Sequence, residues 1–279
     1  SLSQPYYYMA LLNEKGKKYK AMKANLLKAV ELAPENIKAR LKLSKIYVLF
    51  NEIDKASKEV DDILLKEPKQ LDALAIKASI FIRQKKVDDA LLIIDDILVN
   101  NPDHIEALSL KVVVLIRKKS FDTALLVLAP AIQKNSENIS LHLLKIQLDS
   151  LLNNVDAVVS GYEKLVELKP DNIQVKFSLA KVYQKANKPK KAEDTLRLLI
   201  EQNPDLIQFK IALLDFVFVM DEEKAFAQAD EFINKYQDEY KNIAILSKWL
   251  IGKNRAIKAQ ETIKAAIANE AISTENKLS

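Results

Sequence analysis

The sequence has no cysteine and only three glycines among its 279 residues. A chain without cysteine can build neither a disulfide framework nor a thiolate metal site. Glycine normally makes up roughly 7% of a soluble protein, and it supplies the positive-φ turns of β-hairpins and phosphate-binding loops. Its scarcity therefore argues against an all-β fold and against a nucleotide-binding protein built on a glycine-rich loop.

Long apolar runs are also missing, since no stretch reaches the roughly 18 residues that a membrane-spanning helix requires. The start, Ser1-Leu2-Ser3-Gln4, has no initiator methionine and no signal-peptide pattern. We expect such a start in a piece cut from a longer protein, whose export signal or anchor would lie outside it. The cytoplasm and the bacterial periplasm or envelope are both compatible compartments.

The sequence offers little that could form a catalytic or metal site. Its two histidines, His104 and His142, belong to no HExxH pattern, and no GxxxxGK[ST], GxGxxG or GxSxG motif occurs. Adjacent acidic residues such as Asp61 and Asp62 point about 100° apart on a helix. We therefore predict that the chain is not an enzyme and that it binds no metal and no cofactor.

Proline recurs with a fixed period. Five prolines are separated by 34, 34, 68 and 34 residues: Pro34, Pro68, Pro102, Pro170 and Pro204. The missing member of this series falls on Ser136. Because proline lacks an N–H and cannot continue a helix through its own position, each proline marks the end of a helix.

Within each period, the apolar residues have the spacing of two amphipathic helices joined by a short polar turn. A small residue opens the second helix of most units: Ala56, Ala90, Ala124 and Ala192. Small side chains let two helices approach closely while larger ones interlock beside them. One pair cannot bury its own apolar stripe, so each pair must stack on its neighbours.

A 34-residue helix–turn–helix unit with alanine opening its second helix and proline closing it resembles the tetratricopeptide repeat. The resemblance covers about residues 4–269. It implies an all-α fold, a single right-handed α-solenoid superhelix of antiparallel helix pairs over residues 1–270. The units would span about 3–36, 37–70, 71–104, 105–138, 139–172, 173–206, 207–240 and 241–270. Residues 271–279 are polar, and we expect a disordered tail there.

In this family the first helices of the units line a concave groove that holds an extended or helical segment of another protein. The resemblance implies these groove residues: Leu41, Lys45, Val48, Ile82, Arg83, Val113, Ile116, Arg117, Leu143, Gln147, Phe177, Lys181, Ile211 and Phe218. An aliphatic and aromatic stripe edged with charge is typical of a peptide-binding surface. The alternative is that tight coiling buries these side chains against the next repeat.

The sequence thus predicts a non-catalytic scaffold that binds a protein or peptide segment, by analogy within a bacterial envelope or exopolysaccharide secretion assembly. A carboxylate-clamp chaperone role is not expected, because no unit pairs the required lysine and asparagine. Residues 1–50 hold ten Lys/Arg against three acidic residues, so binding of nucleic acid or an anionic surface is a less favoured alternative. A third hypothesis is the regulatory part of a larger enzyme.

Overall fold

The computed structural model describes residues 2–236 and 239–278, and within these residues the chain forms sixteen α-helices and no strand. The chain divides into two compact units, Ser1–Leu148 and Asp149–Ser279. Eight helices lie wholly in the first unit: α1 (Ser3–Lys15), α2 (Tyr19–Leu32), α3 (Ile37–Leu49), α4 (Ile53–Lys66), α5 (Leu71–Arg83), α6 (Val87–Asn100), α7 (Ile105–Arg117) and α8 (Phe121–Lys134). Helix α9 (Ile139–Leu151) contains the boundary.

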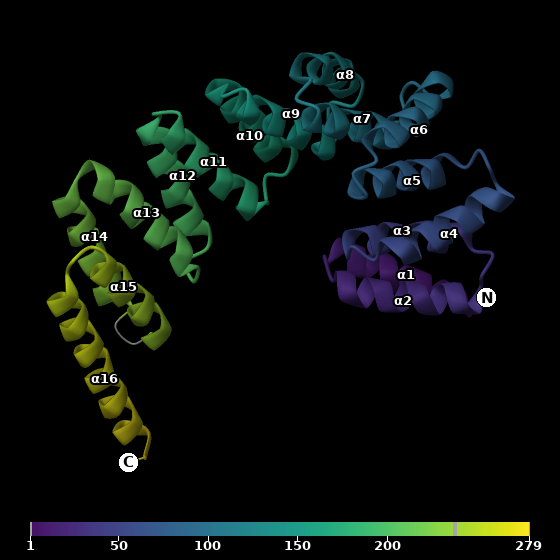
Figure 1. The fold of residues 1–279 in the computed structure, drawn as a ribbon. Coiled ribbons are helices and arrows are strands. Elements are labelled where there is room, and N and C mark those ends of the chain that lie inside the picture. The colour runs from purple at the N-terminus through teal and green to yellow at the C-terminus, as the bar shows by residue number, and fades with distance from the viewer. Residues whose placement is uncertain (1, 237–238, 279) are drawn as a thin grey trace. The chain divides into compact units, whose positions relative to one another are not determined.

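The second unit continues the same sequence of helices (Figure 1). Its members are α10 (Val155–Leu168), α11 (Ile173–Lys185), α12 (Pro189–Gln202), α13 (Ile207–Met220), α14 (Glu222–Lys235), α15 (Tyr240–Gly252) and α16 (Ala256–Leu278). The predicted all-α fold of paired helices is confirmed. One continuous solenoid over residues 1–270 stays a prediction. Helix α16 runs on through 271–278, where we expected a disordered tail, and no glycine or proline stands there to end it.

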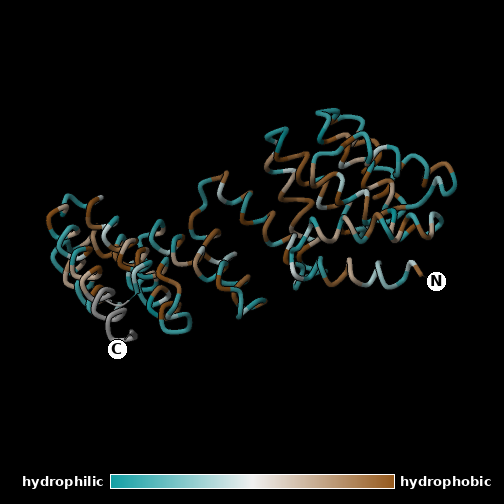
Figure 2. The backbone as a smooth tube through the Cα atoms, turned by 90° about the horizontal axis from the view of Figure 1, so that it is seen from below, coloured by the Kyte–Doolittle hydropathy of each residue, from teal (hydrophilic) through white to brown (hydrophobic). Residues whose placement is uncertain are grey.

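Within each unit, sequential helices pack as pairs, and each pair packs on the next. The first helices also meet one another directly, α3 with α5, α5 with α7, and α13 with α15. The small residues that open the second helices are fully buried: Ala56, Ala90, Ala124, Ala192 and Ala225. Hydrophobic and hydrophilic residues alternate along the helices of both units (Figure 2), as expected for helices that bury one stripe.

The turn inside seven of the eight helix pairs has one residue with positive φ, which is not a glycine in any of them; the exception is the α13–α14 turn, where Asp221 is extended. Three lysines and four asparagines take the position: Lys17, Lys85, Lys119, Asn51, Asn153, Asn187 and Asn254. The next N–H then bonds back to a carbonyl in the preceding helix, as in Ser120 N to Leu115 O at 2.9 Å. This left-handed end satisfies the free carbonyls of the helix terminus. The scarcity of glycine therefore does not mean an absence of positive-φ turns.

Five of the turns between pairs, those before α3, α5, α7, α9 and α11, end on a side chain that caps the next helix. The capping residues are Asn36, Gln70, His104, Asn138 and Asn172, each accepting a hydrogen bond from a backbone N–H three residues later. Such caps satisfy one of the free donors at a helix start. The proline-marked stop and the polar cap together define the first helix of each unit, and hence which residues its exposed face carries.

Candidate functional site

Three of the predicted groove residues lie in the core of the first unit. Leu41 and Val48 belong to the apolar cluster around α3 and α4, and Ile82 belongs to the cluster around α5 and α6. All three side chains are buried. The prediction that they line an open groove was wrong, because successive first helices meet directly, α3 with α5 and α5 with α7.

The exposed face further along the first unit is different. Lys45, Arg83, Arg117, Leu143 and Gln147 are exposed, and Val113 and Ile116 are half-buried. Leu143 keeps 48% of its surface accessible. On the first-helix face, meaning the exposed side of α3, α5, α7 and α9, the predicted apolar residues that remain accessible in this unit are therefore those of α7 and α9.

An open hollow of about 320 Å³ lies between α7 and α9. Its lining comes from four positions in each of two successive repeats: Glu106, Ser109, Leu110 and Val113 from α7, and Ser140, Leu143, Leu144 and Gln147 from α9. Each α9 residue stands 34 positions after its α7 counterpart. We call this feature the α7–α9 hollow. It brings together Val113, Leu143 and Gln147 of the predicted set and adds Leu110 and Leu144, which the apolar pattern had not separated from core residues.

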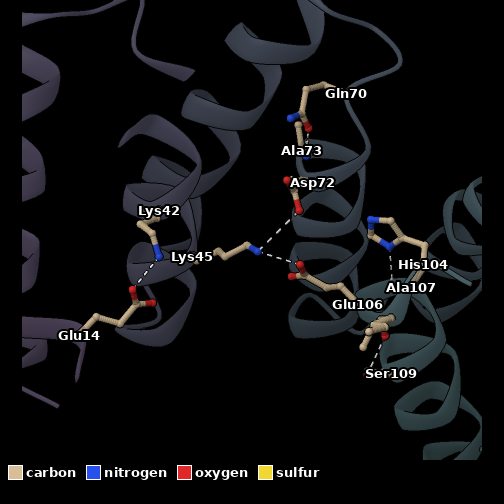
Figure 3. A network of polar contacts seen from close by, with 11 residues as sticks. Glu14, Lys42, Lys45, Gln70, Asp72, Ala73, His104, Glu106, Ala107 and Ser109 are labelled. Carbon is tan, nitrogen blue, oxygen red and sulfur yellow. Dashed lines mark hydrogen bonds and ion pairs between the residues drawn. The ribbon is translucent and has the colours of Figure 1, made fainter. Parts of the chain in front are cut away.

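A charged network adjoins the α7–α9 hollow (Figure 3). Lys45 reaches from α3 so that its Nζ lies 2.7 Å from Glu106 Oε2 and 3.9 Å from Asp72 Oδ1. Both carboxylates stand in the first turn of their helices, α7 and α5. The positive end of the helix dipole favours a carboxylate there. Two carboxylates thus share one ammonium group, next to an apolar hollow.

Arg117 has a structural role as well as an exposed position. Its Nη1 donates a hydrogen bond of 2.8 Å to the carbonyl oxygen of Ile82, near the end of α5. A cation at this place satisfies a carbonyl of the last helical turn and interacts well with the helix dipole. Arg83 lies exposed at the end of the same helix. The basic edge of the first-helix face is therefore at the C-terminal ends of α5 and α7.

In the second unit, the predicted aromatic residues are mostly packing residues. Phe177 meets Phe209 edge-on at 5.2 Å between ring centroids, and Lys181 Nζ lies 4.3 Å above the Phe177 ring. Phe218 packs in the same way against Phe226 and Trp249, at 5.8 and 6.1 Å. Ile211 is half-buried against this core. Phe177, Ile211 and Phe218 are thus partly buried against the core of the second unit.

Neither histidine has the surroundings of a catalytic group. His104 Nδ1 accepts the backbone N–H of Ala107 at 3.2 Å and so caps α7. His142 Nε2 lies 2.8 Å from the carbonyl oxygen of Ser136. Over residues 2–236 and 239–278, no group of three or more metal-ligating side chains is found, and no helix is both long and apolar enough to cross a membrane.

A family model described as the tetratricopeptide repeat matches this chain twice, at residues 18–80 and 159–214. The same helix pair also runs through the described helices between and beyond these stretches. The chain therefore contains tetratricopeptide repeats. Such repeats generally serve as protein–protein interaction scaffolds without catalytic activity. No curated protein sequence matches the chain.

Solved structures similar to this tetratricopeptide repeat protein come from several sources. PilW, a widely conserved type IV pilus biogenesis factor, is 15% identical, with 74% of this chain and 95% of that chain covered and a TM-score of 0.56. The human IFIT1 dimer with PPP-AAAA is 17% identical, with 92% and 70% covered and a TM-score of 0.55. PilF of Pseudomonas aeruginosa is 15% identical, with 74% and 94% covered and a TM-score of 0.50. At these identities the likeness concerns the fold alone.

Proposed function

We propose that this protein is a non-catalytic scaffold that binds a segment of a partner protein on the first-helix face, with the α7–α9 hollow as the main contact. One observation carries the proposal. The hollow is open, and four aliphatic side chains from two successive repeats converge in it: Leu110, Val113, Leu143 and Leu144. Apolar surface gathered in a depression and edged with polar groups is typical of a recognition surface.

The free energy of binding would come from an apolar side chain of the partner that covers the exposed part of Leu143 and its neighbours. Each square ångström of apolar surface removed from water contributes about 25 cal/mol. The amide of Gln147 is exposed at the edge of the hollow, where it can bond to the partner's backbone. An extended or helical segment is therefore a suitable occupant.

The setting that we propose is a bacterial envelope or exopolysaccharide secretion assembly. PilW, whose fold is similar, is described as a type IV pilus biogenesis factor. That description supports the setting.

The proposal is tested by affinity capture with three forms of the protein. The wild type is compared with Leu143→Glu in the hollow and with Leu126→Glu on α8. Leu126 is a matched control because it is 75% exposed and lies outside the hollow. We expect partner proteins that the wild type and Leu126→Glu retain and that Leu143→Glu loses. Equal retention by all three forms would remove the hollow as the binding site.

A second candidate function is binding to an anionic polymer or surface at the turn between α1 and α2. Half of the ten basic residues of residues 1–50 are in ion pairs, namely Lys23, Lys28, Arg40, Lys42 and Lys45. Four lysines close together at the turn, Lys15, Lys17, Lys18 and Lys20, form no ion pair within the described part of the chain. Exchanging Lys17, Lys18 and Lys20 for glutamine should abolish any mobility shift of single-stranded RNA at low salt.

A further inference from the structure

We infer that the α7–α9 hollow selects a basic–aliphatic segment, in which a leucine, isoleucine, valine or methionine enters the hollow and a neighbouring lysine or arginine binds Glu106. This inference rests on the proposed function and names the chemistry of the partner. The preference for a basic residue follows from the charged side chains at the edge of the hollow, and not from the aliphatic side chains that line it.

The acidic character of the wall follows from a count of charges. Asp72, Glu106 and Lys45 form one connected group with two negative charges and one positive charge. Lys45 lies much closer to Glu106 than to Asp72, so Asp72 is the less well neutralised of the two. Glu106, the other carboxylate that shares Lys45, lines the hollow, so the one surplus negative charge of this group lies beside the binding surface.

A basic residue of the partner would neutralise the surplus negative charge of this group and would not have to replace Lys45 in it. When a lysine or arginine from the partner binds Glu106, Lys45 can remain with Asp72, and each carboxylate then has its own cation. All three side chains are between one third and about one half exposed, so moving Lys45 carries little desolvation cost. An acidic residue of the partner would instead meet two carboxylates and be repelled.

Other polar groups of the hollow do not offset this preference. The hydroxyl of Ser109 already donates to the carbonyl oxygen of Ile105 at 2.8 Å. Two basic residues lie on α7, and both have partners: Lys111 pairs with Asp95 at 2.8 Å, and Arg117, at the far end of the helix, donates to the carbonyl oxygen of Ile82. Glu106 stands in the first turn of α7, whereas Arg117 stands in its last turn. A bound segment should place its basic residue near the start of α7.

The probe for this inference is a library of random 12-residue peptides displayed on phage and selected on the wild-type protein. Selected peptides are synthesised with a fluorescent label, and each is paired with an analogue whose lysines and arginines are replaced by glutamate. Dissociation constants are measured for the wild type, Glu106→Gln, Glu106→Lys, Leu143→Glu and Glu167→Gln. Glu167 is the control, an exposed acidic residue of the second unit paired with Lys164.

We expect the selected peptides to pair an aliphatic with a basic residue. Their affinity should fall roughly three- to tenfold in Glu106→Gln, fall further in Glu106→Lys, and stay unchanged in Glu167→Gln. Raising the salt concentration should weaken wild-type binding more than that of Glu106→Gln. The charge-reversed peptides should bind Glu106→Lys better than they bind the wild type.

The two ways of failing are distinct. If peptides depend on Leu143 but are acidic or neutral, or bind Glu106→Lys as well as they bind the wild type, the basic–aliphatic inference is overturned while the binding function stands. If no selected peptide depends on Leu143, both the inference and the hollow as a binding site are overturned.

Discussion

Two leucines on α9 have opposite surroundings although they stand only two residues apart. Leu141 is 0% exposed and packs in the cluster that includes Val112 and Leu128. Leu143 is 48% exposed and lines the α7–α9 hollow. Exchanging each one for alanine should therefore cost very different amounts of stability, although the chemical change is the same.

The magnitudes follow from burial. Leucine to alanine removes the equivalent of about three methylene groups, worth roughly 2.4 kcal/mol when they are fully buried. For Leu141 the cavity left behind adds to this, giving a total of about 3–5 kcal/mol. For Leu143 about half of the side chain is already in water and no closed cavity forms, so the cost is about 1 kcal/mol.

The assay is urea unfolding followed by circular dichroism, together with amide hydrogen exchange of residues 139–151. Exchange reports the local free energy of opening even if a repeat array does not unfold in a single step. Leu141→Ala should lower the urea midpoint and speed exchange in α9, while Leu143→Ala should change both only slightly. Equal destabilisation by the two substitutions would refute the assignment of the faces of α9, and with it the hollow.

Three further predictions concern the architecture. Lys119→Gly should raise the melting temperature, because lysine at its positive φ is strained by about 1 kcal/mol relative to glycine; an unchanged or lower value would argue against the left-handed turn. Ala124→Arg should abolish cooperative unfolding by circular dichroism, because the side chain lies fully buried at a close helix contact; a wild-type melting curve would show that the contact is misassigned. The pKa of Glu163 is lowered, chiefly because the Tyr183 hydroxyl donates to its carboxylate at 2.6 Å. This bond stabilises the fold above the ordinary pKa of glutamate and is lost as the pH falls through the lowered pKa. Tyr183→Phe should thus lower the melting temperature at pH 7 by an amount equivalent to about 1 kcal/mol and by less at pH 3; a constant difference would contradict this origin.

The repeat, the helix pairs and the all-α fold could be predicted from the sequence, because proline and alanine recur with the period of the repeat. Each of these recurrences has a local physical cause. The exposed face could be predicted only in part. Leu41 and Leu143 occupy the same place in their repeats, 102 residues or three periods apart. Yet Leu41 is 7% exposed and Leu143 is 48% exposed. How closely two first helices approach depends on all side chains between them, and no single position carries that information.

The charged network could not be predicted from the sequence, for a similar reason. Asp72 and Glu106 are one period apart, so their common place in the repeat can be read from the sequence. That Lys45 would reach both of them could not be read, because it stands 61 residues before Glu106 and meets it past an intervening repeat. The glycine content of the sequence, in contrast, is a poor guide to the turns. Asparagine and lysine take the positive-φ positions here, so a low glycine count says little about turns.

The most direct test of the central claim is amide hydrogen exchange of the wild-type protein with and without a peptide selected on it. The account predicts that binding slows exchange in residues 105–117 and 139–151, the two helices that form the α7–α9 hollow, and that this protection disappears in Leu143→Glu. Protection confined to the second helices α6 and α8, or to the lysine-rich turn at residues 15–20, would contradict it.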